Sequence, residues 1–202
     1  MQDELRYVAG LDLGRTRNYT ALAVLERRWH PGTPQEFIAS GTRGYQGEYR
    51  YRVVGLDRCS LGTPFPDAVS WVKRMLQPYG EIGALVVDAT GLGSVVMDLL
   101  RNADLGTRIV GTVITGDQAS PPGTGSTAAG YATVSRAELL TGLQVAVQAR
   151  KFKVARKECR EWEQLGRELV LLRLEGKRAG VQDDLAQALA LALWWGMRPG
   201  RG

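Results

Sequence analysis

Little in this sequence of 202 residues points to a disulfide framework, a zinc site or a membrane anchor. The two cysteines, Cys59 and Cys159, lie far apart and form no CxxC motif. The whole chain contains one histidine, His30, so the sequence lacks the ligands of a zinc site. Such cysteines are typical of reduced thiols inside the cell. The longest apolar run, residues 185–195, contains Gln187 and is shorter than the roughly 20 residues that cross a bilayer. We therefore expect a cytoplasmic protein, and the polar first residues carry no signal-peptide core.

ATP binding by a P-loop is also excluded, because no GxxxxGK[ST] motif occurs anywhere in the chain. The composition itself is ordinary for a globular protein, with 44% apolar and 23% charged residues. The length fits one α/β domain, so residues 1–202 are expected to form a single domain.

The charge is unevenly distributed. The chain carries a net charge of +5 and has a pI near 9.4, which favours a polyanionic partner. Residues 150–178 hold ten basic and five acidic residues. The difference, five positive charges, equals the net charge of the whole chain. A solvated helix face with pairs such as Lys157–Glu161 accounts for part of this run, so it does not by itself establish nucleic-acid binding.

Hydrophobic periodicity divides the chain into strands and helices. We expect strands at residues 7–13, 20–25, 48–56, 82–87 and 108–114, with a short edge strand at 152–155. We expect helices after Pro64, at 91–102, from Ser135 to about 149, at 157–169 and at 183–195, while 169–174 is ambiguous and His30 falls in a loop. Ser135 and Glu138 have capping-box spacing. Residues 116–130 are expected to form a flexible loop near the active face, and 196–202 a frayed tail.

This order of elements predicts an α/β fold: a mixed sheet whose first three strands are antiparallel, with helices on both faces. Right-handed crossovers then place the first strand beside the fourth. The carboxyl ends of these two strands carry Asp12 and Asp88. The two acids are therefore expected to meet at one edge of the sheet.

Acidic residues interrupt three segments that otherwise look buried. Asp12 lies inside the first strand, Asp88 ends the run 84–87, and Asp183 and Asp184 open the last apolar helix. Buried ionised carboxylates must be paired, bound to metal or used as helix caps. No lysine or arginine lies in these short segments, and converging carboxylates repel one another unless cations compensate them. Oxygen-only ligands suit Mg²⁺ or Mn²⁺, and two such ions can hydrolyse a phosphodiester.

Structural roles explain some of these acids equally well. One of Asp183 and Asp184 is a good N-cap, and Asp88 before Thr90 can cap the helix that follows. Asp12 is the hardest to explain in this way, because Leu11 and Leu13 flank it within a strand.

Five segments, spread in order over nearly the whole chain, carry a specific combination of motifs. They are Gly10-Leu-Asp-Leu-Gly with Tyr19-Thr-Ala-Leu-Ala-Val-Leu, Leu61-Gly-Thr-Pro-Phe-Pro-Asp, Val86-Val-Asp-Ala-Thr-Gly-Leu-Gly, Val134-Ser-Arg-Ala-Glu-Leu-Leu, and Asp183-Asp-Leu-Ala-Gln-Ala-Leu-Ala-Leu-Ala. Together they resemble the C-terminal nuclease domain of phage and prophage large terminases.

The resemblance implies a ribonuclease H-like fold and two-metal cleavage of double-stranded viral DNA concatemers during genome packaging. It makes Asp12 and Asp88 metal ligands, with a third ligand from Asp183 or Asp184; we favour Asp183. It also implies partners: the packaging ATPase domain of the same polypeptide, absent here, the portal and the small terminase subunit. We expect no membrane partner.

Three positions depart from the family pattern. Gln182 stands where many members have histidine, Asn18 where an additional acid is common, and Ser135-Arg136 where lysine is frequent. We expect weaker or Mn²⁺-preferring activity rather than its loss.

DNA contacts are expected from Arg15 and Arg17, in the turn after Asp12, whose guanidinium groups suit a scissile phosphate. The flanking backbone would be held by Arg136, Lys151, Lys153, Arg156 and Lys157. Such contacts position a duplex without reading its sequence. Two alternatives remain open: a Holliday-junction resolvase of the same fold, which shares the Gly-Leu-Asp-Leu-Gly opening, and a degenerate, non-catalytic DNA-binding domain.

Overall fold

The computed structural model describes residues 6–14, 18–30, 47–91, 94–116, 131–175 and 182–198. The strands are β1 (Tyr7–Asp12), β2 (Ala21–His30), β3 (Glu48–Arg58), β4 (Ile82–Asp88), β5 (Thr107–Thr115), β6 (Ala132–Ser135) and β7 (Phe152–Val154). The helices are α2 (Phe65–Leu76), α3 (Ser94–Asn102), α4 (Arg136–Gln148), α5 (Trp162–Glu175) and α6 (Asp184–Gly196), with a 3₁₀ turn η1 (Gln77–Tyr79).

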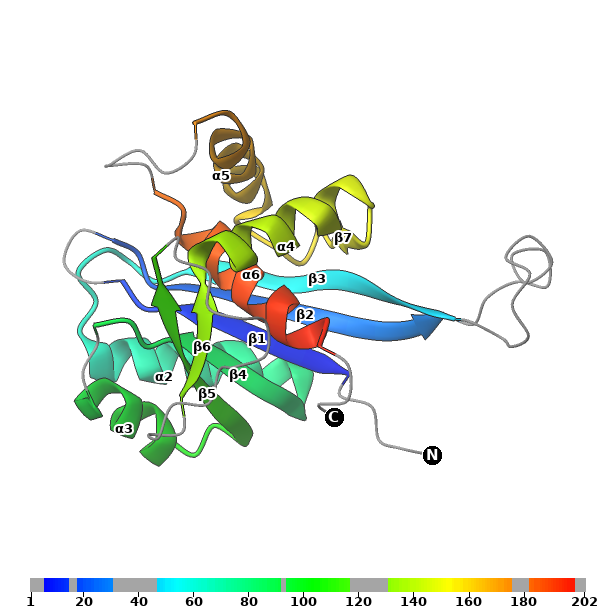
Figure 1. Ribbon diagram of the computed structural model, residues 1–202. Coiled ribbons are helices and arrows are strands. Elements are labelled where there is room, and N and C mark those ends of the chain that lie inside the picture. Colours follow the sequence, from blue (N-terminus) through cyan, green and yellow to red (C-terminus); the bar gives the residue numbers. More distant parts are fainter. Residues whose placement is uncertain are drawn as a thin grey trace, which may run out of the picture.

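The strands form a seven-stranded mixed sheet in the order β6-β5-β4-β1-β2-β3-β7 (Figure 1). β1, β2 and β3 are antiparallel neighbours, whereas β4 and β5 continue the sheet in parallel from β1. This confirms the predicted fold class and the placement of the first strand beside the fourth.

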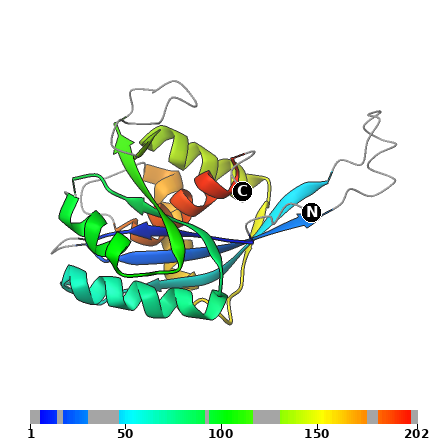
Figure 2. The same ribbon diagram turned by 90° about the horizontal axis from the view of Figure 1, so that it is seen from below.

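Helices cover both faces of the sheet (Figures 1 and 2). Alternate β1 side chains face opposite layers, so that Val8 joins the cluster beneath α4, α5 and α6, while Ala9 and Leu11 join the one beneath α2 and α3. This period of two is the property of a strand buried on both faces. The sheet therefore holds the apolar core as two separate layers.

Two strands differ from the sequence prediction. β2 continues through the polar residues Arg27 and Arg28 to His30, so His30 ends a strand instead of lying in a loop. Cross-strand pairing explains the extension: Trp29 packs edge-on against Tyr49, with ring centroids 4.9 Å apart, and Arg27 lies over the Tyr49 ring. The edge strand β6 was not predicted, because its four residues give too short a pattern.

The helices agree more closely. Ser135 caps α4, accepting a hydrogen bond from the Glu138 N–H at 3.0 Å. The reciprocal half of the capping box is not seen, because the Glu138 carboxylate accepts instead from the Trp194 indole at 2.7 Å. α5 begins at Trp162 and includes the ambiguous stretch as helix, and Gly196 still belongs to α6 rather than to a tail. Of the loop predicted at residues 116–130, residues 117–130 lie outside the described part of the chain.

Close packing of α6 on β1 depends on Gly10. A β-carbon at Gly10 would lie 2.0 Å from the carbonyl oxygen of Ala188, so any side chain there would push the helix off the strand. Since β1 ends at Asp12 and α6 begins at Asp184, this contact fixes the distance between the two acidic segments. Within the described part of the chain, no helix combines the length and apolarity required to cross a membrane.

Candidate active site

The four predicted acids line one cleft. β1 and β4 pair in parallel with Leu11 opposite Val87, so the next residues, Asp12 and Asp88, end the two strands side by side. The start of α6 adds Asp183 and Asp184, and the cleft has a volume of about 370 Å³. Its walls are formed by Asp12, Asn18, Asp88, Thr90, Ile114, Thr115, Gly116, Arg136, Asp183, Asp184 and Gln187. Carboxylates from three distant segments therefore share one hollow at the edge of the sheet.

Asp184 is the most constrained of the four. The residue is 3% exposed, and its Oδ2 has no hydrogen-bond partner within the described part of the protein. Burial raises the pKa of the Asp184 carboxyl, and the neighbouring Asp183 raises it further, against the opposing effect of the Tyr19 backbone N–H. A buried oxygen without a partner, lining a polar cleft, is suited to an external ligand such as a cation.

Asp183 is the N-cap residue of α6 but does not cap it, because its side chain makes no cap hydrogen bond. Instead its Oδ2 accepts from Arg136 Nη2 at 2.6 Å. Among the described residues that line the cleft, Arg136 is the single cationic side chain. The lining of the cleft thus holds one guanidinium and four carboxylates, and Arg58, which does not line it, also lowers the pKa of Asp184.

Asp88 makes a local hydrogen bond but does not take the helix-capping role that its sequence allows. Its Oδ1 accepts from the Thr90 N–H at 2.8 Å, while the Thr90 hydroxyl accepts from the Ile114 N–H at 2.8 Å. The bond closes a turn and does not cap α3, which begins only at Ser94. A carboxylate has two oxygens with several lone pairs, so this bond leaves capacity for another ligand.

The donor set, all oxygen and strongly acidic, fits Mg²⁺ or Mn²⁺ better than a soft metal. In the described ranges no three His, Cys, Asp or Glu side chains already surround a common point as a metal would require. A cation would therefore have to draw the carboxylates together, and Arg136 would have to release Asp183 if that residue became a ligand.

The predicted DNA contacts lie in different places. Arg136 reaches the cleft, whereas Lys151, Lys153, Arg156 and Lys157 lie on or beside β7, at the sheet edge opposite β6, and do not line it. Arg15 and Arg17 lie outside the described residues. Of the three departures from the family pattern, Asn18 and Arg136 line the cleft, but Gln182 is exposed and does not.

Sequence reasoning missed Glu168, which it counted among the charges of a solvated run. Glu168 is fully buried, and burial raises its pKa to about 7. Arg58, which ends β3, lies with Nη1 3.9 Å from Glu168 Oε1 and stacks over the Tyr19 ring. The available signal was helical spacing: Glu168 follows Leu165 by three positions, on the face that carries that buried leucine.

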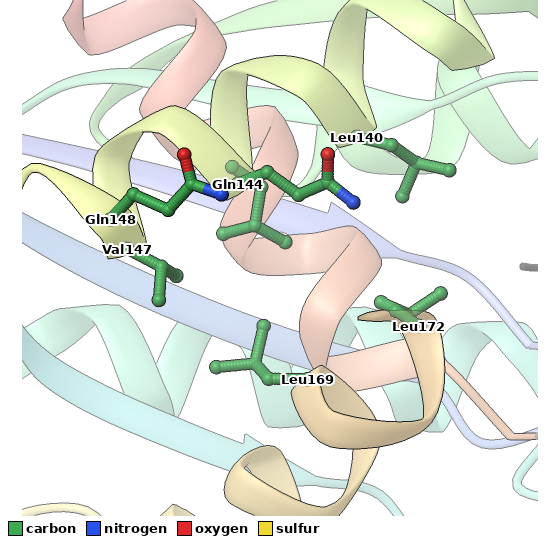
Figure 3. A pocket seen from close by; sticks show the side chains of 7 residues that line it. Leu140, Gln144, Val147, Gln148, Leu169 and Leu172 are labelled. Carbon is green, nitrogen blue, oxygen red and sulfur yellow. The ribbon is translucent and has the colours of Figure 1, made fainter. Parts of the chain in front are cut away.

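A second hollow, between α4 and α5, is apolar (Figure 3). It measures about 140 Å³, and leucines and one valine line it with Gln144 and Gln148. Figure 3 shows the two glutamine side chains on the α4 side of the hollow, above Leu169 of α5. It shares no residue with the acidic cleft and contains no group capable of acid–base or metal chemistry.

No family model matches the sequence, and no curated protein is similar to it. Solved structures do resemble the fold. The nuclease domain of the large terminase subunit gp2 of bacterial virus Sf6 is similar over 93% of this chain and 87% of that one, at 14% identity and a TM-score of 0.57.

The large terminase (g2p) nuclease domain of bacteriophage SPP1, determined with bound Mn, is similar over 96% and 89% of the two chains, at 12% identity and a TM-score of 0.52. Thermus thermophilus RuvC reaches a TM-score of only 0.40, too low to assign anything. The chain thus has the ribonuclease H-like fold of the large terminase nuclease domains.

Proposed function

We propose that this protein is a metal-dependent DNA endonuclease that cleaves double-stranded viral DNA concatemers during genome packaging. The observation that carries the proposal is the convergence of Asp12, Asp88 and the Asp183–Asp184 pair on one cleft, which Arg136 faces. The similar nuclease domain of SPP1 was determined with bound Mn, which supports the use of a divalent metal.

Asp12, Asp88 and one of the last two acids would hold the metal. When bound, a pair of Mg²⁺ or Mn²⁺ ions would activate a water and stabilise the leaving oxygen of the phosphodiester. Asp12 and Asp88 would hold their positions because β1 and β4 are neighbouring core strands. Asp184, with its buried Oδ2, is better placed than we expected to be the direct ligand from the pair, since Asp183 is engaged by Arg136.

Arg136 would pair first with Asp183 and then, once metal is bound, with a DNA phosphate. In the absence of a cation its guanidinium neutralises Asp183. Once a metal takes over that charge, the same group would be free to hold a phosphate oxygen of the DNA backbone. Contacts of this kind, together with Arg15, Arg17 and the basic residues around β7, would give low sequence specificity and a steep dependence on salt.

The resemblance to large terminases also supplies the proposed setting. The domain would work in the host cytoplasm beside the packaging ATPase of the same polypeptide, the portal and the small terminase subunit.

Plasmid cleavage tests the function. Supercoiled plasmid with Mn²⁺ or Mg²⁺ should be nicked and linearised by the wild type and not by Asp12→Ala. Asp98→Asn is a matched control, because Asp98 is an exposed acid on α3 paired with Arg101 and does not line the cleft. Cleavage by Asp12→Ala at the wild-type rate would refute the site.

A non-catalytic DNA-binding domain is the second candidate, favoured by the ion pair that already occupies Asp183. It predicts DNA binding without cleavage at any Mn²⁺ concentration. A resolvase of the same fold would instead prefer four-way junctions to linear duplex in a binding assay, which separates it from both.

A further inference from the structure

The N-terminus of α6 needs a cap that its own sequence does not provide. Every residue of α6 is buried, so its first backbone N–H groups cannot all be satisfied by bulk water. The residue in the N-cap position, Asp183, makes no side-chain cap hydrogen bond. The partner has to come from elsewhere in the fold.

Glu168 provides that cap from another helix. Its Oε2 accepts a hydrogen bond from the Ala186 N–H at 2.9 Å, and the side chain is fully buried. Ala186 is the third residue of α6, the position that an ordinary N-cap side chain would reach. A carboxylate here also lies at the positive end of the helix dipole.

Capping from α5 has a consequence for the cleft. If Asp183 capped its own helix, its carboxylate would fold back onto the backbone of the first turn. Because Glu168 takes this role, Asp183 extends to Arg136 and both acids line the cleft. We infer that Glu168 is a positioning residue that caps α6 in place of Asp183 and so leaves the Asp183–Asp184 pair available to metal, an inference that rests on the proposed function.

The surroundings of Glu168 hold it in place. Gln164, one turn earlier in α5, opposes the rise in the pKa of this carboxyl. Arg58 lies near its second oxygen at 3.9 Å and is anchored by Glu161 at 3.0 Å. The ring on which Arg58 stacks belongs to Tyr19, whose backbone N–H contacts the Asp184 carboxylate. α5 is thus connected to the acidic cleft in two ways: directly, by the hydrogen bond between Glu168 and Ala186, and indirectly, through Arg58 and Tyr19.

Two substitutions of Glu168 distinguish the length of its side chain from its charge. E168Q keeps the length and an acceptor oxygen but loses the charge, whereas E168D keeps the charge and is one methylene too short to reach Ala186. Apparent Mn²⁺ affinity, measured by calorimetry without DNA, should stay within about twofold of wild type for E168Q and fall about tenfold or more for E168D. Hydrogen exchange at the Ala186 amide should accelerate in E168D alone.

Leu165→Ala is the matched control, because Leu165 is a buried residue of the same helix whose loss costs stability without removing the cap. It should leave Mn²⁺ affinity unchanged. Equal affinity losses in E168D and Leu165→Ala, or a loss in E168Q as large as that in E168D, would overturn the inference. Should E168D not fold, Glu168→Ala, which also removes the acceptor of the Ala186 N–H, takes its place in the comparison with E168Q and Leu165→Ala.

The outcome is also separable from that of the proposed function. A wild-type protein that neither binds Mn²⁺ nor cuts DNA would refute the function, and the positioning role with it, while exchange at Ala186 would still report the cap. A wild type that binds and cleaves, with E168D binding Mn²⁺ as tightly, would refute the positioning role alone.

Discussion

The acidic residues at the two ends of the β1–β2 pair have opposite surroundings. Glu26, on β2 opposite Tyr7, lies at one end of the β1–β2 pair, and Asp12, opposite Ala21, lies at the other end with the cleft. Glu26 accepts from Arg6 at 3.0 Å and Arg28 at 2.8 Å. Burial alone would raise the pKa of Glu26, but these arginines hold it below its ordinary value of 4.5. Asp184 of α6, which lines the cleft, is also buried, but the Tyr19 backbone N–H and Arg58 do not offset its burial and the charge of Asp183, and its pKa is raised.

The comparison shows what distinguishes a site from a structural ion cluster. Burial of an acid is common to both, so burial is not the signal. Where the fold supplies the counter-ions of a buried carboxylate, removing one partner of the ion pair destabilises that fold. A carboxylate whose counter-ions are too few, as in the cleft, requires a charge from outside, which is the property expected of a metal-binding site.

The largest effect should come from removing the ligands themselves. Asp12→Ala or Asp88→Asn should reduce plasmid cleavage by more than the roughly 10–100-fold that loss of an outer-shell partner costs. The thermal midpoint should stay equal or rise, because removing one of several like charges relieves repulsion. Activity assays and thermal unfolding of the same metal-free samples check both parts, and a variant that is inactive because it is strongly destabilised would contradict the electrostatic explanation.

Neutralising an acid should change the free energy of unfolding in opposite directions at Glu26 and in the cleft. Glu26→Gln removes charge-assisted hydrogen bonds and should lower the free energy of unfolding by about 1–3 kcal/mol. Asp184→Asn removes a repulsion with Asp183 and should leave that free energy unchanged or raise it. Urea unfolding at neutral pH without metal measures both, and equal destabilisation of the two variants would show that the cleft acids are compensated after all.

The pH dependence of stability should differ in sign. The pKa of Glu26 is lowered on folding, so its contribution is present above about 4.5 and is lost as the pH falls through the folded value. The pKa of Glu168 is raised to about 7, so the folded protein binds its proton more tightly and gains stability as the pH falls from about 7 towards 4.5.

Urea unfolding at a series of pH values across that window tests this second contribution. Glu168→Gln should flatten the wild-type profile by about 3 kcal/mol between its ends, since each pKa unit corresponds to about 1.4 kcal/mol. Glu26→Gln should leave the slope in the same window unchanged. A wild-type profile that is already flat would mean that Glu168 is ionised throughout.

The sequence predicted the sheet and the convergence of Asp12 with Asp88 because both depend on local patterns and on the handedness of crossovers. It did not predict which buried acids are compensated. Arg52 lies opposite Glu26 only through the register of β2 and β3, and Arg136 reaches Asp183 across 47 residues of chain. Glu168 was missed for the same reason: its partner is a backbone N–H of another helix, which leaves no trace in composition or charge.

The smallest effect should come from the basic edge at β7, where binding and chemistry can be separated. Lys153 lies on β7 opposite Arg52 of β3 and does not line the cleft. Lys153→Ala should weaken duplex binding similarly for unrelated sequences and reduce the slope of log affinity against log salt by about one. Cleavage at saturating DNA should be unchanged. A full wild-type slope would remove this edge from the DNA path and leave Arg136, with the turn after Asp12, as the remaining predicted phosphate contacts.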